Sequence, residues 1–260
     1  MSIAVAKSIT GNMPLNFNNL PVFSPDPAVL SEQLIVGLDS RDSRSRAFNL
    51  LRTTMAKRMK EKGHRLIGIT SATPSAGKSF LSLNLAASLS RVSEDPVILV
   101  DLDLRRASVA GGVGMQVKRG VSDFLNGEVS NLASIGSRVG DTQLALFPTK
   151  SVAKNTAELI SGPNFEKLIS ELRQDTGNST VLFDLPPAFA NDDAMLILAQ
   201  LDAYVMVVDS GKTNIKQVQE VLAMLNPVPC LGTVLNRYSG GFADSYGYGY
   251  GSSSYAKYYD

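Results

Sequence analysis

Apolar residues in this chain fall into short solid runs and into longer stretches with helical spacing. The solid runs predict strands at 66–70, 97–101, 144–147, 180–184, 203–209 and 231–236. Helical spacing predicts helices at 78–91, 163–174, 191–200 and 214–225, and an amphipathic helix between Ser43 and Lys60. Strands that are apolar on both faces and separated by helices are typical of a parallel sheet covered on both sides. We therefore expect an α/β fold.

Both ends of the chain depart from this pattern. Residues 1–40 carry four prolines among Asn and Ser, and we expect an extended, loosely docked or partly disordered segment. Residues 238–260 have no helical or strand period, and Gly and Ser supply ten of these 23 residues. The folded domain is therefore expected to occupy residues 41–237, with a flexible tail after it.

The tail holds seven of the eight tyrosines in the chain. Apart from Tyr238 they are Tyr246, Tyr248, Tyr250, Tyr255, Tyr258 and Tyr259. A segment with so little other apolar content cannot offset the entropy lost on ordering. The tyrosines are either tolerated in a sticky tail or serve as chemical substrates, and the rest of the chain has to decide between these alternatives.

Composition narrows the classes of function. A net charge of +1 argues against a general nucleic-acid binder, which usually carries a basic excess. The one cysteine, Cys230, cannot form an internal disulfide, and we interpret it as core packing in a reducing compartment. No apolar run approaches the ~18 residues of a membrane span, and no signal peptide is evident. These features predict a cytoplasmic protein, unless a partner holds it at a membrane.

The segment between the first strand and the first long helix is a candidate phosphate-binding loop. Ala72 to Ser79 fit the pattern G-x-x-x-x-G-K-[ST], with Ala72 in place of the first Gly. Backbone N–H groups of such a loop and of the following helix N-terminus bind phosphate oxygens. We expect Lys78 to reach the β and γ phosphates and the Ser79 hydroxyl to ligate Mg²⁺.

Carboxylates end two other predicted strands. Asp101 ends the strand 97–101, Asp103 follows two residues later, and Asp184 ends the strand 180–184. Ligands of parallel α/β sheets bind outside the carboxyl ends of the strands, so these carboxylates should meet the phosphate loop there. The sequence therefore predicts a Mg²⁺ and nucleotide site, with Asp184 as the Walker B aspartate.

These motifs together resemble the bacterial tyrosine kinases of the polysaccharide co-polymerase system, which are related to the ParA and MinD ATPases. The resemblance covers residues 44–260 and rests on "SATPSAGKS", "VILVDLDLR", "VLFDLPP" and the tyrosine-rich tail. It implies a P-loop NTPase fold with a mostly parallel sheet of about seven to eight strands flanked by helices. It also implies ATP and Mg²⁺ as cofactors and autophosphorylation of the tail tyrosines.

The resemblance implies roles for particular residues. Lys78, Asp101 and Asp103 are the expected catalytic residues, and Asp101 orients or deprotonates the attacking tyrosine. Ser79, Asp103 and Asp184 are the expected Mg²⁺ contacts. The nucleotide is expected to contact Thr73, Pro74, Ser75, Ala76, Gly77, Lys78, Ser79 and Phe80, with Asn236 at the position where the related ATPases contact adenine.

The same resemblance implies partners: a transmembrane polysaccharide co-polymerase adaptor at the inner membrane, further copies of this chain, and an opposing tyrosine phosphatase. Three departures from the family pattern matter. Thr73 stands where ParA and MinD proteins have a lysine. Asn49 interrupts the E-x-x-R-x-x-R pattern of the oligomerisation helix, which here retains only Arg52. Ser108 stands where fused kinases carry a regulatory tyrosine.

Two other functions share these motifs. A ParA-like ATPase switch would use every phosphate contact, but Thr73 and the tail argue against it. A catalytically idle nucleotide-dependent scaffold is favoured only by Ala72.

Overall fold

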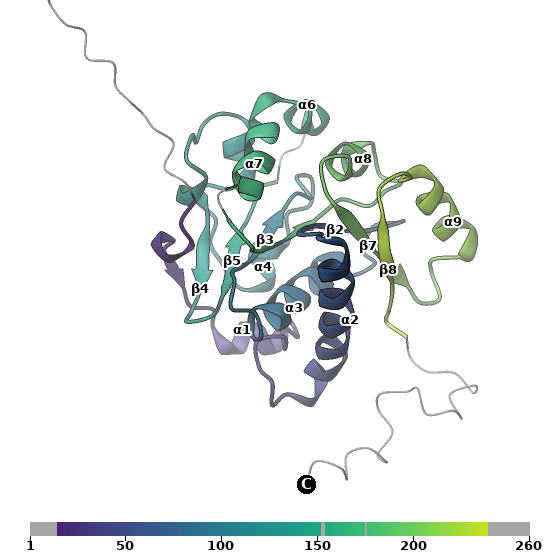
Figure 1. Cartoon of the computed structure of the whole chain (residues 1–260), viewed down its shortest axis with the longest axis horizontal. Coiled ribbons are helices and arrows are strands. Elements are labelled where there is room, and N and C mark those ends of the chain that lie inside the picture. Colours follow the sequence, from purple (N-terminus) through teal and green to yellow (C-terminus); the bar gives the residue numbers. More distant parts are fainter. Residues whose placement is uncertain (1–14, 152–153, 175, 239–260) are drawn as a thin grey trace, which may run out of the picture.

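A single sheet of eight strands forms the centre of the computed structural model, which describes residues 15–151, 154–174 and 176–238 (Figure 1). The strand order is β1-β4-β5-β3-β6-β2-β7-β8. All neighbouring strands are parallel except β4 and β5. The strands are β1 (Val22–Phe23), β2 (Leu66–Ser71), β3 (Val97–Asp101), β4 (Ser137–Val139), β5 (Leu144–Phe147), β6 (Thr180–Asp184), β7 (Ala203–Asp209) and β8 (Cys230–Asn236). The predicted α/β class and strand number are confirmed.

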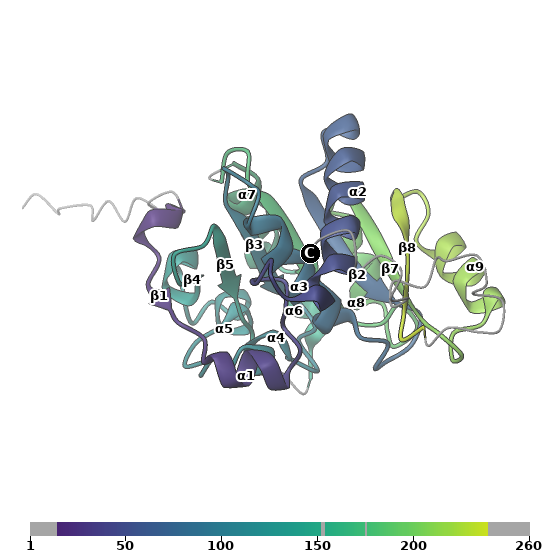
Figure 2. The ribbon, with the colours of Figure 1, turned by 90° about the horizontal axis from the view of Figure 1, so that it is seen from below.

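Helices cover both faces of the sheet. They are α1 (Pro27–Glu32), α2 (Arg46–Lys62), α3 (Lys78–Ser90), α4 (Val109–Gly112), α5 (Val121–Leu125), α6 (Thr156–Ile160), α7 (Pro163–Gln174), α8 (Asp193–Leu198) and α9 (Ile215–Met224). Short 3₁₀ turns occupy Phe17–Asn19, Ser43–Ser45 and Leu132–Ile135. Figures 1 and 2 show α2 and α3 side by side on one face of the sheet, whereas α7 and α8 lie on the other.

Two apolar cores form because successive strand residues point to opposite faces. Ile67 and Ile69 of β2 pack with Met55 of α2 and with the leucines of α3. Leu66 of the same strand belongs to the opposite core, which includes Phe165 of α7. The central strands β2 and β3 are buried along their whole length, as their uninterrupted apolar sequence predicted.

The segment before residue 41 differs from the expected extended or loosely docked chain. Residues 15–40 supply the edge strand β1 and the helix α1, and they bury Leu15, Leu20, Ile35 and Val36. The Asn84 side chain of α3 anchors this segment, because its Oδ1 accepts hydrogen bonds from the backbone N–H groups of Val36 and Gly37 at 2.9 and 3.0 Å. The contacts join residues almost fifty positions apart, so no local pattern predicted them.

The interpretation of Cys230 as core packing is wrong, because Cys230 is exposed. It begins β8, which is the last strand at one edge of the sheet and therefore has a neighbour on one side only. Its Sγ lies 3.5 Å from the carbonyl oxygen of Gly232. Tyr204 of the adjacent strand β7 is buried beside it.

The tail tyrosines from Tyr246 to Tyr259 lie outside the described residues. Tyr238, where the description ends, is about half exposed. Among the helices that the structure describes, each is too short or too polar to cross a membrane.

Candidate nucleotide-binding site

The phosphate loop joins β2 to α3 at the carboxyl edge of the sheet. Ser75 and Gly77 both adopt left-handed backbone conformations, with φ of +62° and +92°. Gly77 is required for a second reason, since a Cβ there would lie 2.1 Å from the side-chain nitrogen of Asn236. The loop ends at the N-terminus of α3, whose first N–H groups have no partner within the helix and can bind an anion.

Lys78 and Ser79 are the first two residues of α3. The Lys78 side chain is only 7% exposed, and its Nζ lies 3.8 Å from Oδ2 of Asp103. The Ser79 hydroxyl donates a short hydrogen bond to Oδ2 of Asp184. It also accepts a hydrogen bond from the Ser108 hydroxyl at 2.6 Å. The loop and the ends of β3 and β6 therefore meet, as the strand pattern predicted.

Asp184 ends β6 and is fully buried. Burial raises the pKa of Asp184 to about 6, although the hydrogen bond from Ser79 and the charge of Lys78 work in the other direction. Ser82, one turn further along α3, lies 3.1 Å from its Oδ1. A buried carboxylate beside two hydroxyls presents hard oxygen ligands of the kind that Mg²⁺ prefers.

Asp101 ends β3 and pairs in register with Asp184. Its Oδ2 accepts hydrogen bonds from the N–H groups of Ser108 and Val109 at 3.1 and 3.2 Å, and its Oδ1 accepts one from Asp103 at 3.2 Å. Burial, followed by the charge of Asp184, raises the pKa of Asp101 well above its ordinary value. Asp101 therefore holds the backbone of the loop after β3 on the side away from the cavity.

Asp103 is the carboxylate that faces the cavity beside the phosphate loop. That cavity measures about 260 Å³, and it is lined by Pro74, Ser75, Gly77, Lys78, Ser79, Phe80, Asp103, Arg106, Ser108, Pro187 and Arg237. Burial raises the pKa of Asp103, while Lys78 and Arg106 favour its charged form. The cavity thus combines cations and a carboxylate beside a glycine-containing loop, which suits a phosphate chain with a metal ion.

Four residues at this cavity were absent from the predicted set: Arg106, Ser108, Pro187 and Arg237. Ser108 had been noted only as a missing tyrosine. Asn236 does not line the cavity. Its Nδ2 instead donates to the carbonyl oxygen of Ala76 at 2.8 Å, so Asn236 holds the loop. Arg106 directly follows the D-x-D-x-R pattern and Arg237 directly follows Asn236, so the signal was proximity to motifs already identified.

No group of three or more His, Cys, Asp or Glu residues with metal-binding geometry occurs in the described part of the chain. Mg²⁺ in phosphoryl-transfer sites is commonly held by one or two carboxylates together with the phosphates of the substrate. The pair formed by Ser79 and Asp184 fits such a partial ligand set.

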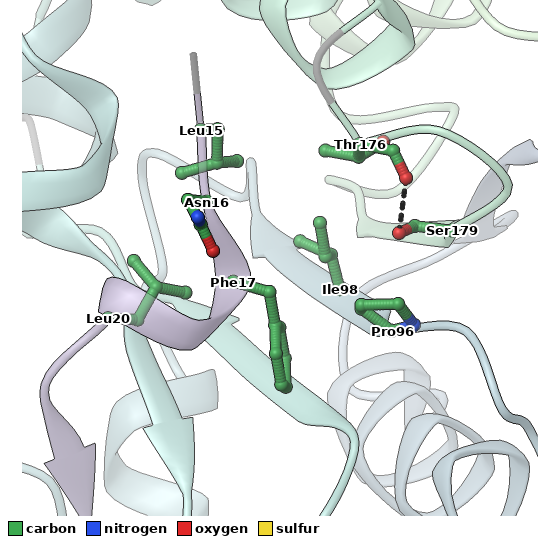
Figure 3. A pocket seen from close by; sticks show the side chains of 8 residues that line it. All are labelled: Leu15, Asn16, Phe17, Leu20, Pro96, Ile98, Thr176 and Ser179. Atoms are coloured by element: carbon green, nitrogen blue, oxygen red, sulfur yellow. Dashed lines mark hydrogen bonds between the residues drawn. The ribbon is translucent and has the colours of Figure 1, made fainter. Parts of the chain in front are cut away.

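Larger cavities exist elsewhere but lack this chemistry. One of about 320 Å³ lies at the amino ends of β3 and β6, remote in the sheet from the phosphate loop, and is lined by Leu15, Asn16, Phe17, Leu20, Pro96, Ile98, Thr176 and Ser179 (Figure 3). The described residues that line it include no ionisable side chain. Another of about 420 Å³ lies between α7 and α8.

The sheet order, the loop and the acidic strand ends define the class of this protein: a P-loop nucleotide-binding domain. Residues 67–246 match the family described as the CobQ/CobB/MinD/ParA nucleotide binding domain. The chain belongs to this family and, within it, to the bacterial tyrosine-protein kinases.

Two curated relatives and one solved structure carry the second part of that assignment. The putative tyrosine-protein kinase EpsB of Ralstonia nicotianae is 30% identical over 204 residues, which are 78% of this chain and 26% of the relative. The tyrosine-protein kinase CpsD of Streptococcus pneumoniae is 30% identical over 179 residues, 66% of this chain and 76% of the relative. The kinase domain of the Escherichia coli tyrosine kinase ETK superposes with a TM-score of 0.71 at 26% identity and covers 80% of this chain and 83% of that domain.

The chain spans about a quarter of the length of relatives such as EpsB, and about three quarters of CpsD. These similarities favour a tyrosine kinase over a ParA-like switch.

In helix α2, two residues of the altered E-x-x-R-x-x-R pattern make contacts within the chain. Asn49 Oδ1 accepts a hydrogen bond from the Ser88 hydroxyl at 3.0 Å, and Arg52 Nη1 donates to the Ser88 carbonyl oxygen at 3.1 Å. Both residues therefore fasten α2 to α3.

Proposed function

We propose that this chain is an ATP-dependent protein tyrosine kinase that phosphorylates the tyrosines of its own tail. One observation carries the proposal: the tail begins at the rim of the cavity. Arg237 lines the cavity and hydrogen-bonds to the phosphate loop, and the next residue, Tyr238, starts the tyrosine-rich segment. Six further tyrosines follow Tyr238 in this segment, so a chain with its tail at the rim of a nucleotide site carries its own acceptor groups.

In this proposal the phosphate loop and Lys78 bind the phosphates of ATP. Lys78 must exchange its 3.8 Å contact with Asp103 for the β and γ phosphates, whose negative charge then compensates this buried cation. Ser79 and Asp184, with Asp103 near them, would hold Mg²⁺, which would neutralise part of the phosphate charge. Phosphoryl transfer depends mainly on such positioning and neutralisation.

The chemical step moves the γ-phosphoryl group from ATP to a phenol oxygen. The bond between the γ phosphorus and the bridging oxygen breaks, ADP leaves, and the phenol proton passes to a carboxylate. We assign this proton to Asp101, because burial and the neighbouring Asp184 raise its pKa and so favour proton uptake. Asp101 lies behind the loop after β3, so this assignment requires that loop to shift when the phenol enters. A phenol with a pKa near 10 is protonated at pH 7, and a loose transition state lets the proton leave late.

The proposed acceptors are Tyr246, Tyr248, Tyr250, Tyr255, Tyr258 and Tyr259, presented mainly to a neighbouring copy of the chain. A random coil of 23 residues has a root-mean-square end-to-end distance of about 26 Å, from 5–6 Å multiplied by the square root of the residue number. That length reaches an adjacent site. Each added phosphate brings about −1.5 to −2 charges, so multiple phosphorylation should release the tail and loosen the assembly.

The proposed setting is the cytoplasmic side of the inner membrane, where a transmembrane polysaccharide co-polymerase would hold and activate the kinase and a tyrosine phosphatase would reverse its action. This setting follows from the family and from the tail. We propose a role in exopolysaccharide synthesis or export, in a homo-oligomer whose contacts differ from those of relatives with an intact E-x-x-R-x-x-R helix.

A mixing experiment tests the proposal. A Lys78→Met chain with its tail is incubated with a chain that has an intact site but lacks residues 239–260, together with ATP and Mg²⁺. Phosphotyrosine on the Lys78→Met chain is the expected result. Phosphate release without phosphotyrosine in the wild-type protein would instead identify an ATPase. Labelling of the wild type at a rate independent of its concentration, with no labelling of the mixture, would contradict transfer between chains.

A further inference from the structure

The end of β8 holds the phosphate loop through two consecutive residues. Asn236 donates from Nδ2 to the carbonyl oxygen of Ala76 at 2.8 Å. Arg237 donates from Nη1 to the carbonyl oxygen of Ser75 at 2.7 Å. The side chains of the last residue of β8 and of the residue after it therefore bind two successive carbonyl groups of the loop, about 160 residues away in sequence.

Arg237 is itself fixed by a buried carboxylate. The same Nη1 donates to Oδ2 of Asp209 at 2.7 Å, and Asp209 is only 3% exposed. Oδ1 of Asp209 has no hydrogen-bond partner among the residues described. A buried carboxylate is costly unless a cation compensates it, so Asp209 draws the guanidinium toward the end of β7. Lys212 also faces Asp209, at 3.7 Å, but its side chain is 71% exposed and it makes no contact with the loop among the described hydrogen bonds.

Both residues joined by this contact have unusual backbones. Ser75 has φ of +62° and Arg237 has φ of +59°. Left-handed backbone is unfavourable for residues other than glycine and persists where the surroundings enforce it. The hydrogen bond between Arg237 and Ser75, held in place by the buried Asp209, can keep both residues in this unfavourable conformation.

We propose that Arg237 is a positioning residue for nucleotide binding, which keeps the phosphate loop in its binding conformation by holding the strained Ser75 backbone against Asp209. We call Asp209, Arg237 and Ser75 the loop clamp. Arg237 acts through the backbone of the loop, and the nucleotide phosphates are bound by the loop N–H groups and by Lys78. The inference rests on the nucleotide-binding part of the proposed function and does not require tyrosine phosphorylation.

The test measures the dissociation constant of a fluorescent ADP analogue in the presence of Mg²⁺ on the full chain. Arg237→Gln should weaken binding about tenfold, the scale expected for losing a hydrogen bond to a charged donor. Lys212→Gln is the matched control, because it removes an equal charge facing Asp209 without touching the loop. It should leave binding within about twofold, as expected for an exposed ion pair.

Ser75→Gly separates positioning from direct contact. Glycine adopts left-handed backbone without strain, so a loop with glycine at this position needs less enforcement. In the Ser75→Gly background, Arg237→Gln should therefore weaken binding by no more than about threefold. An equal loss in both backgrounds would overturn the proposal and would indicate that Arg237 contacts the nucleotide itself.

Two further outcomes would also overturn the loop clamp. One is an equal loss from Lys212→Gln, which would assign the effect to the charge near Asp209. The other outcome concerns the double variant Asp209→Asn/Arg237→Gln, which removes both charges together and is used if Arg237→Gln alone does not fold, as judged by circular dichroism. Wild-type nucleotide affinity in that folded double variant would overturn the loop clamp. If the wild-type protein binds no nucleotide, the proposed function is refuted. If the wild-type protein and the Arg237→Gln variant bind the nucleotide with equal affinity, only the loop clamp is refuted.

Discussion

Asp184 should lower the stability of the nucleotide-free protein at neutral pH, although it is central to the proposed function. It is fully buried, and burial raises its pKa from 3.8 to about 6. The folded state therefore binds a proton at Asp184 more tightly than the unfolded state does. The stabilisation from this proton is present below about pH 4 and is lost as the pH rises through about 6.

The size of the effect follows from the pKa. A rise from 3.8 to about 6 corresponds to at most about 3 kcal/mol of folding free energy lost at pH 8, at 1.36 kcal/mol for each pKa unit. Asp184→Asn removes the charge but can still accept only one of the hydrogen bonds from Ser79 and Ser82, a loss of about 1 kcal/mol. We expect a net gain of about 1–2 kcal/mol at pH 8 and none at pH 4.5.

Urea denaturation without Mg²⁺ or nucleotide, at pH 4.5 and pH 8, measures this difference. Asp202→Asn is the control of opposite sign: burial opposes the effect, but hydrogen bonds from the backbone of Leu66 and Arg65 and from Arg173 lower the pKa of Asp202. That variant should lose stability at both pH values to nearly the same extent, because the lowered pKa of Asp202 confines the loss of its contribution to pH values below about 3.8. A gain for Asp184→Asn that is as large at pH 4.5 as at pH 8 would refute the electrostatic reasoning.

Three further outcomes are expected. Lys78→Met should abolish tyrosine phosphorylation, with a loss of roughly 3–4 kcal/mol of transition-state stabilisation by analogy with other electrostatic contacts; retained phosphotyrosine in a folded variant would contradict the catalytic role of Lys78. Asp101→Asn should slow transfer by about 10²–10⁴-fold in single-turnover assays while calorimetry shows a much smaller change in ATP affinity; a wild-type rate here with a slow Asp103→Asn would move the proton to Asp103. A cytoplasmic fragment of a membrane adaptor should raise the phosphorylation rate of the purified chain, and full activity insensitive to any such fragment would argue against external activation.

The central part of the fold was predictable because its signals are local. A strand buried on both faces is apolar throughout, and β3 therefore appears in the sequence with the bounds that the structure has. The loop from Ala72 to Ser79 and the aspartates at 101 and 184 follow strand ends, and parallel strands bring such ends to one edge. Their meeting at hydrogen-bond distance follows from the topology.

The parts that were missed depend on contacts between distant residues. β1 has two residues, too few for a periodic signal, and it exists because it pairs with β4. The docking of residues 34–37 depends on Asn84. Arg237 follows the identified Asn236 directly in sequence, but its hydrogen bond to the Ser75 carbonyl group depends on the fold. Cys230 was misassigned because its neighbours in sequence are apolar, while its exposure is set by the place of β8 in the sheet.

The strand order has a practical consequence for labelling. β1 and β8 form opposite edges of the sheet, and seven inter-strand steps of about 4.8 Å separate them by roughly 34 Å. Cys230 is an exposed native thiol on the β8 edge, and Asn19 is exposed just before β1. An Asn19→Cys variant would therefore carry two dyes across the full width of the domain. An Asn19→Cys/Cys230→Ser variant could be immobilised by the β1 edge alone, with the start of the tail and the cavity rim free to meet another copy.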